Sequence, residues 1–177
     1  MIRNYLIVLL IASCPMLFAQ EKQTPTLRSL LQEQLKSTHI QEDWFVPVMD
    51  AVKGMTAEQA AWKDSSSNHS VGQLVNHLVF WNSRVLANMK GEKQDPFKGN
   101  NDETFNAFDA KSWKETVQKL DDVMREFEKL ADTASEEGLK KMANAMAHVG
   151  THNAYHTGQI ITVRRSQGSW PLPKTAK

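Results

Sequence analysis

The spacing of the apolar residues constrains the fold more than any other feature of this sequence. From Thr26 onward, apolar residues return every three or four positions, and no convincing run alternates between apolar and polar with period two. That spacing places apolar side chains along one face of a helix, whereas a half-buried strand needs the missing alternation. The sequence therefore predicts an all-α domain.

The helix boundaries follow from the apolar pattern and from residues that start or stop helices. The spacing of a capping box, Ser or Thr followed three positions later by Gln or Glu, occurs at Thr56, Ser70 and Ser112. The predicted helices are a long first helix from Leu27 to Gly54 kinked at Pro47, a short one from Thr56 to Trp62, one from Ser70 to about Met89, one from Ser112 to about Ala131, and a last one that begins between Glu136 and Met142 and stops before Gly168 and Pro171.

The connections and the chain length then predict the architecture. The segment from Gly91 to Asn101 contains Pro96 and Gly99, and it is predicted to be a mobile surface loop. A chain of 177 residues suffices for one core but hardly for two. Four long amphipathic helices in such a chain predict a single four-helix bundle.

The charge balance argues against a nucleic-acid partner. The chain has 21 basic and 20 acidic residues and a formal net charge of +1 at pH 7. A nucleic-acid-binding surface needs a concentrated basic patch, and this sequence has none that is large enough. We therefore expect a small-molecule ligand and no nucleic acid.

The first twenty residues are typical of an export signal. Arg3 precedes an apolar run from Tyr5 to Phe18, and the composition becomes polar after Ala19. The run is shorter than the roughly 20 apolar residues that a permanent membrane anchor needs. The sequence thus predicts a signal peptide over residues 1–19 and a mature domain over residues 20–177, located in the periplasm or outside the cell, without a stable transmembrane anchor.

Cys14 supports an alternative way of processing the N-terminus. Ile11 to Cys14 resembles a lipoprotein signal, in which the cysteine becomes the lipidated first residue. The apolar run continues from Pro15 to Phe18, where a polar tether is expected, so cleavage after Ala19 is the preferred interpretation. Because Cys14 is the only cysteine, the mature chain then has no thiolate, and any metal must bind through histidine or carboxylate.

Two histidines have the spacing of a helical metal site. His152 and His156 are four positions apart, so their Cβ atoms lie roughly 5–6 Å apart on one helix face. No Glu follows His152, which excludes the general base of the zinc proteases. His77 lies between Leu74 and Trp81 on an apolar face and is the best candidate for a third ligand.

Another interpretation of these histidines remains open on the residues alone. A histidine on an apolar face is more often a hydrogen-bonded core residue than a ligand. His39, on a polar stretch, and His69, in a loop, are weaker ligand candidates. His148 lies one turn before His152 and is a candidate substitute ligand, second-sphere group or rim residue.

Residues around the histidines are expected to support the site. A metal-bound imidazole donates its other N–H to a carbonyl, a carboxylate or water, and the candidates for this role are Asn76, Asn153, Gln159 and His148. Trp81 and Tyr155 are candidates for the lining of a pocket beside the histidines. Trp62 or Asp64 is a candidate for the entrance of that pocket. Arg164 and Arg165 either pair with acidic residues of neighbouring helices, which is the preferred interpretation, or contact an anionic substrate.

Two segments carry a family resemblance. His152 to Ile160, followed by Arg164-Arg165 and then Gly168 to Pro171, resembles the last-helix signature of the DinB-like superfamily. Ser70 to Leu78, with His77 inside Leu-Val-Asn-His-Leu, is similar to the second-helix motif of that family. The resemblance extends from about Leu27 to the end of the chain.

The resemblance implies a four-helix bundle with an up-down-down-up arrangement, a three-histidine metal site at His77, His152 and His156, and often a homodimer. Relatives include thiol S-transferases and isomerases that use bacillithiol, mycothiol or glutathione. Zinc is the default ion, with nickel, iron, manganese or copper as alternatives. The expected function is a metal-dependent transferase or hydrolase, and the alternatives are a noncatalytic metal- or ligand-binding bundle and a metal-free structural bundle.

Overall fold

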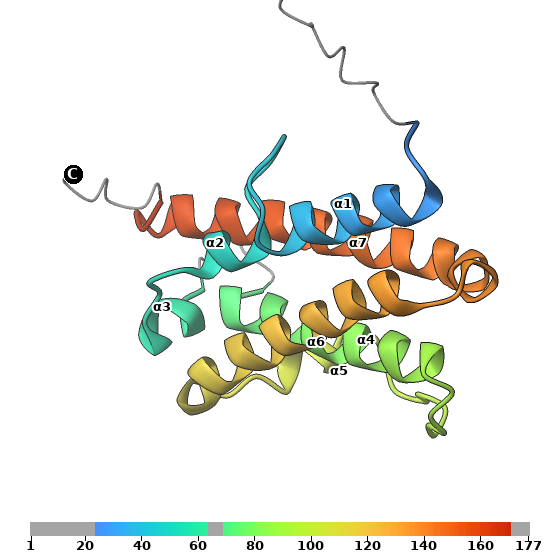
Figure 1. Cartoon of the computed structure of the whole chain (residues 1–177). Coiled ribbons are helices and arrows are strands. Elements are labelled where there is room, and N and C mark those ends of the chain that lie inside the picture. The colour runs from blue at the N-terminus through green and yellow to red at the C-terminus, as the bar shows by residue number, and fades with distance from the viewer. Residues whose placement is uncertain (1–23, 64–68, 171–177) are drawn as a thin grey trace, which may run out of the picture.

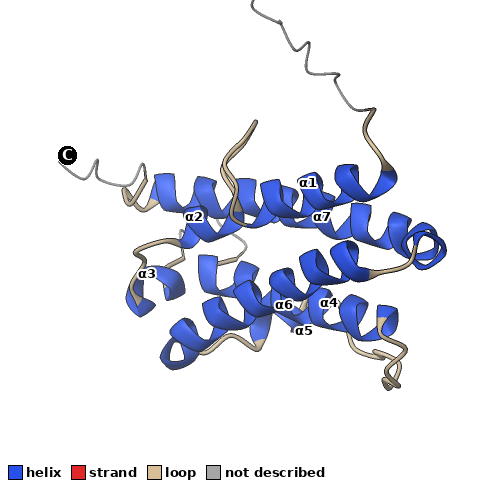
Figure 2. Ribbon diagram, in the orientation of Figure 1, coloured by secondary structure: helices blue, strands red, loops and turns tan. Residues whose placement is uncertain are grey.

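A computed structural model of the chain describes residues 24–63 and 69–170. Throughout these residues the secondary structure is helical, and it contains no strand (Figure 2). The helices are α1 (Leu27–His39), α2 (Val48–Val52), α3 (Ala57–Ala61), α4 (Val71–Met89), α5 (Glu103–Asn106), a 3₁₀ turn (Ala110–Ser112), α6 (Trp113–Thr133) and α7 (Glu136–Ser166). The all-α prediction is therefore confirmed for the described residues.

The helices α1 and α7 lie side by side and run in the same direction (Figure 1). Arg28, near the start of α1, bonds to Glu136 at the start of α7. Two turns further along, Gln34 approaches the carbonyl oxygen of Ala147. Gly150 permits this close packing, because a Cβ there would lie 2.8 Å from Cγ of Gln34.

The helices α4 and α6 run parallel to each other and opposite to α1 and α7 (Figure 1). Asn82 on α4 contacts the sulfur of Met124, and Lys90, just past the end of α4, pairs with Glu126. Taken in chain order, α1, α4, α6 and α7 run up, down, down and up. The shorter α2, α3 and α5 are parts of the connections between these long helices.

The core fills the space between the four long helices. Its largest fully buried apolar side chains come from all of them, as the apolar stripes of the sequence require. These residues are Leu35, Leu74, Leu78, Leu120, Met124, Phe127, Leu139, Met146 and Ile160.

The predicted long first helix is wrong, because the chain leaves the helical conformation at Ile40 and returns to it only at Val48. We expected a kink at Pro47, but Pro47 instead caps the start of α2. Proline lacks the N–H that a continuous helix needs, and it also disfavours helical geometry at the preceding residue. The segment between the helices protrudes from the bundle (Figure 1) and leaves Trp44 93 % exposed.

The predicted helix starts are correct at two capping boxes and only partly correct at the third. The hydroxyl oxygens of Thr56 and Ser70 each accept from the backbone N–H of the glutamine three residues later. In return, their own backbone N–H donates to the Oε1 atom of that glutamine. Ser112 precedes α6 as expected but makes no capping bond. Its hydroxyl donates instead to the carbonyl of Asp109, because a 3₁₀ turn ends there.

Two arginines satisfy carbonyl groups at helix ends. Arg28 donates to the carbonyl oxygens of Ala131 and Asp132, at the end of α6. Arg164 is buried and donates to the carbonyls of Ala51 and Ser169. The predicted pairing of Arg164 with an acidic residue is therefore wrong, because the last carbonyls of a short helix leave acceptors without helical partners.

His39 ties α1 to α6 through two carboxylates. The ring is completely buried, its Nδ1 lies 2.6 Å from Glu128 Oε1, and its Nε2 lies 2.9 Å from Asp121 Oδ1. Both ring nitrogens therefore lie within hydrogen-bond distance of a carboxylate oxygen, and the ring joins two acidic side chains of α6 to α1. Burial raises the pKa of Asp121, but hydrogen bonds from Arg125 and His39 outweigh this effect and lower it overall.

The predictions for the N-terminus lie outside the described residues, as does Asp64. This applies to the signal peptide over residues 1–19 and to Cys14. Within the described ranges, no helix has the combination of length and apolar character that crossing a membrane requires.

We expect His39→Leu to lower the free energy of unfolding by roughly 3 kcal/mol, because it leaves two mostly buried carboxylates without their hydrogen-bond partner. The measurement is urea denaturation at neutral pH. Lys36→Ala, an exposed change on the same helix, is the control and should stay within about 0.5 kcal/mol of wild type. Equal stability of the two variants would contradict a structural role for the buried His39 ring.

Candidate metal centre

A buried amide pair joins α4 to α7 next to the histidines. Asn82 Nδ2 donates to Asn153 Oδ1 at 2.9 Å, and both residues are fully buried. The free amide hydrogens of Asn153 point at the sulfur of Met124. A buried amide that loses its partner is costly, so this bond favours one register between the two antiparallel helices. That register sets His77 on α4 opposite His152 and His156 on α7.

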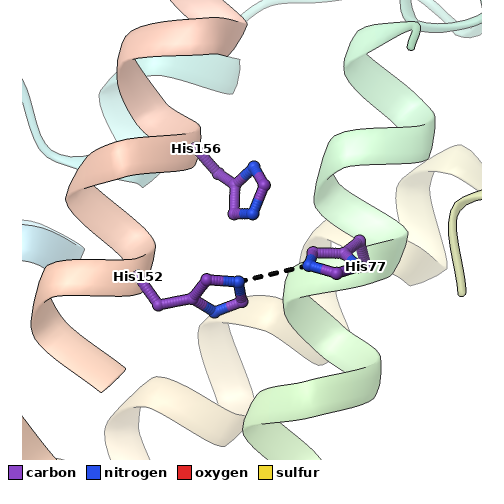
Figure 3. A group of neighbouring side chains, drawn as sticks. All are labelled: His77, His152 and His156. Carbon is purple, nitrogen blue, oxygen red and sulfur yellow. Dashed lines mark hydrogen bonds between the residues drawn. The ribbon is translucent and has the colours of Figure 1, made fainter. Parts of the chain in front are cut away.

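The three predicted histidines converge between the two helices (Figure 3). Each offers one ring nitrogen, and these three atoms all lie within 4.8 Å of one another. The Nε2 atoms of His77 and His152 are 3.2 Å apart. His77 and His156 are buried and His152 is half-buried, so the cluster has one side open to solvent.

Neighbouring oxygen atoms orient two of the rings. Thr104 donates its hydroxyl hydrogen to the carbonyl of Asn101, so its oxygen accepts from His77 Nδ1 at 2.6 Å. The Oε1 atom of Gln159 accepts from His156 Nδ1 at 2.6 Å. With the proton on Nδ1, each ring keeps its Nε2 lone pair free for a cation.

Phe105 holds the ring of His77 from one face. The two rings stack with centroids 3.9 Å apart and planes within 6°. On its other face Phe105 stacks on His69, again at 3.9 Å. Thr104 and Phe105 both belong to α5, and Asn76 fastens that short helix by donating to the carbonyl of Thr104.

The electrostatics of the cluster keep the imidazoles neutral. Burial, and to a lesser extent the neighbouring His156 and His152, lower the pKa of His77 to about 3. Burial also lowers the pKa of His156 to about 4, helped by His152 and opposed by the hydrogen bond to Gln159. The pKa of His152 falls for the same reason, burial. At neutral pH the three lone pairs are therefore available without proton competition.

The cluster forms part of the wall of a pocket of about 760 Å³. Trp81, Phe105 and Tyr155 supply aromatic surface, and Asn101, Asp102 and Gln159 supply polar groups. His69 and His148 also line it. The open side of the cluster thus faces a cavity large enough for a small organic molecule.

The supporting residues are only partly those that the sequence predicted. Trp81, Tyr155 and His148 line the pocket as expected, and Gln159 contacts a ring as expected. Trp62 packs against the core and does not line the pocket.

Asn76 and Asn153 bond to groups other than the three rings. Thr104 takes the place expected of them, and sequence reasoning missed it, as it missed Asp102 in the pocket wall. Both residues come from a connection without apolar periodicity, which gives no signal of what it contacts.

The donor set fits a divalent transition metal. Three neutral imidazoles with free lone pairs match the nitrogen ligands that zinc, nickel, copper and iron accept. Ordered second-sphere partners, here Thr104 and Gln159, are the usual companions of histidine ligands. Since no fourth protein group joins the cluster in the described residues, at least one coordination position is left for a ligand from the pocket.

We expect Thr104→Val to weaken metal binding 10–100-fold, because His77 loses the acceptor that fixes its proton on Nδ1. Thr116→Val is the matched control, since Thr116 on α6 is also buried but bonds to the carbonyl of Ser112, just before that helix. Competition with a fluorescent zinc chelator measures both affinities. Equal affinities in the two variants would contradict the second-sphere role of Thr104.

The metal-free protein should lose stability as the pH falls from about 6.5 toward 4. Over that range the unfolded chain takes up protons at His77 and His156, while the folded chain, whose pKa values there are about 3 and about 4, does not. Thermal unfolding of chelator-treated protein measures the effect. His77→Gln should show a weaker pH dependence, and an unchanged dependence would contradict the assignment.

A comparison with known families identifies one match. The DinB superfamily profile matches residues 48–160, well over half of the chain, and the match includes all three histidines. It is narrower than the expected resemblance from Leu27 to the end, and α1 lies outside it. No curated protein and no solved structure matches the chain. By the extent of the profile match, the chain belongs to the DinB superfamily.

Proposed function

We propose that this protein binds one divalent metal ion through His77, His152 and His156 and uses it as a metal-dependent transferase or hydrolase. The observation that carries the proposal is the convergence of three neutral ring nitrogens on the wall of a 760 Å³ pocket. A structural zinc site is normally closed by four protein ligands, whereas a reactive one keeps a position open.

A divalent ion in this site would supply Lewis acidity, which makes water or a thiol a better nucleophile near neutral pH. Residues of the protein orient two of the three rings and shield the cluster from water on one side. Thr104 and Gln159 hold His77 and His156 in the tautomer that leaves Nε2 free. Phe105 fixes the plane of His77 and excludes water from that side of the cluster.

The identity of the nucleophile divides the two reaction classes. Thiol transfer is the activity that relatives suggest, and a thiolate is a good ligand for such a site. The export signal proposed for residues 1–19 argues against it, because small thiol cofactors are chiefly cytoplasmic. Hydrolysis needs only water, and Asp102 and His69 in the pocket wall are candidate proton acceptors.

The alternative is a noncatalytic bundle that binds a metal ion or a small ligand. One observation favours it: among the described residues no carboxylate touches the three rings, so the cluster itself contains no general base. The same pocket would then serve for binding alone.

We also propose that the protein is exported and forms a homodimer. Export rests on the apolar run from Tyr5 to Phe18. Dimerisation rests on large apolar side chains that are exposed along α1 and the segment after it, among them Leu30, Trp44 and Phe45. Light scattering of wild type and Trp44→Lys tests the second proposal, with a dimer expected only for wild type.

Cobalt substitution tests the proposed site and its open position together. We expect the Co²⁺-loaded protein to show the visible absorption of a low-coordinate site, and this absorption should change when a small thiol is added. A chelator should abolish turnover of a nitrophenyl ester or of a thiol plus an electrophile, and metal should restore it. A thiol-sensitive spectrum without turnover of either kind would support the noncatalytic alternative. A spectrum that no thiol changes would contradict the open site.

A further inference from the structure

The pocket wall carries charge of one sign. Among the residues that the structure describes, no lysine or arginine lines the pocket, and Asp102 is its single carboxylate. Lys63 lies near enough to influence His69 but does not line the pocket. The ion proposed at the three histidines would itself attract an anionic donor group. Away from the ion, a pocket that takes anionic groups usually presents arginine or lysine to them, so the rest of this wall favours a ligand whose far end is not anionic.

The carboxylate of Asp102 is free to receive a ligand. Asp102 stands at the start of α5, but its side chain makes no capping bond there. Its backbone N–H donates to Asn100 Oδ1, and its carbonyl oxygen accepts from the N–H of Phe105. Among the described residues it has no ion-pair partner. Its charge nevertheless acts inside the pocket, where burial and Lys63 lower the pKa of His69 and Asp102 opposes them.

The neighbouring wall is flat and apolar. The indole N–H of Trp81 donates to Asn101 Oδ1 at 3.1 Å, and this bond ties the ring to the segment that carries Asp102. Trp81 and Asp102 both line the pocket. Phe97 packs edge-on against Trp81 from the same connection. Val85 and Val149 continue the apolar surface along the helices. A flat aromatic body fits such a wall, because stacked or edge-on ring contacts add to the burial of apolar area.

We propose that the pocket takes a small aromatic amine that also carries a metal-binding group. Its metal-binding end reaches the three histidines, its ring lies against Trp81, and its ammonium group pairs with Asp102. This inference rests on the proposed function, because the first contact is with a bound ion. It disfavours glutathione, whose net charge is negative, as the ligand.

Three benzenethiols that differ only at the para position test the charge preference. They carry an aminomethyl, a methyl or a carboxymethyl group, and the para geometry prevents that group from binding the same ion as the thiol. Each is titrated into Co²⁺-loaded protein and followed by visible absorption at about pH 8, where ordinary histidines are neutral. We expect the amine to bind most tightly and the carboxylate least, with roughly a tenfold ratio between them.

Two matched variants identify the source of the preference. Asp102→Asn should abolish the tenfold ratio, because it removes the one carboxylate of the wall. Asp95→Asn removes the same charge from the same connection, at an exposed residue that does not line the pocket, and should retain the ratio.

Three results would overturn the inference. Equal or tighter binding of the carboxylate by wild type would do so while leaving the open metal site intact. A preference for the amine that survives Asp102→Asn would show that the discrimination has another source. Failure of all three thiols to change the spectrum would overturn the inference and the proposed function together.

Discussion

The hydrogen bond between Asn82 and Asn153 governs how α4 and α7 lie against each other. Apolar packing alone allows two helices to slide, because one leucine contact is much like the next. A buried amide pair is less tolerant, since a shift leaves donors and acceptors without partners. The bond lies one to two turns from His77 along α4 and one residue from His152 along α7. The register that it sets is the one in which the rings face each other.

The packing of α4 against α7 buries the rings of His77 and His156 and half-buries that of His152. A buried imidazole ring destabilises the fold unless its nitrogen atoms have hydrogen-bond partners or a bound cation. Burial also keeps the His77 and His156 rings unprotonated, because it lowers their pKa values. The protein satisfies the outer nitrogen of two rings, with Thr104 for His77 and Gln159 for His156. The inner nitrogens are left facing each other. A bound cation would remove this remaining cost, which is why the arrangement favours a metal site over a hydrogen-bonded core.

Local signals in the sequence predicted much of the helical framework. Thr56 and Ser70 cap helices as expected because a capping box involves only residues three positions apart. The same reasoning did not hold at Ser112, where the preceding 3₁₀ turn uses the hydroxyl. At Pro47 the pattern predicted a kink where the chain makes a full break. Helix propensity does not predict how much apolar contact the residues between α1 and α2 make with the rest of the protein, and that contact decides whether the helix continues.

The candidate site was predictable to the extent that it follows from helix geometry. His152 and His156 share a face because they are four apart, and His77 lies on an apolar stripe. Thr104 and Asp102 were not predictable, since they come from a connection whose path depends on tertiary contacts. The role of Arg164 was mistaken for the same reason: its partners are backbone carbonyls, which have no sequence signature.

The most direct test of the account is the metal content of the protein, purified without a His-tag or a chelating column, beside His77→Ala and His156→Ala. Elemental analysis should find one divalent ion per chain in wild type and none in the two variants, with all three proteins folded by circular dichroism. The central claim is contradicted if folded wild-type protein carries no stoichiometric metal, even after incubation with zinc, nickel, iron and manganese salts.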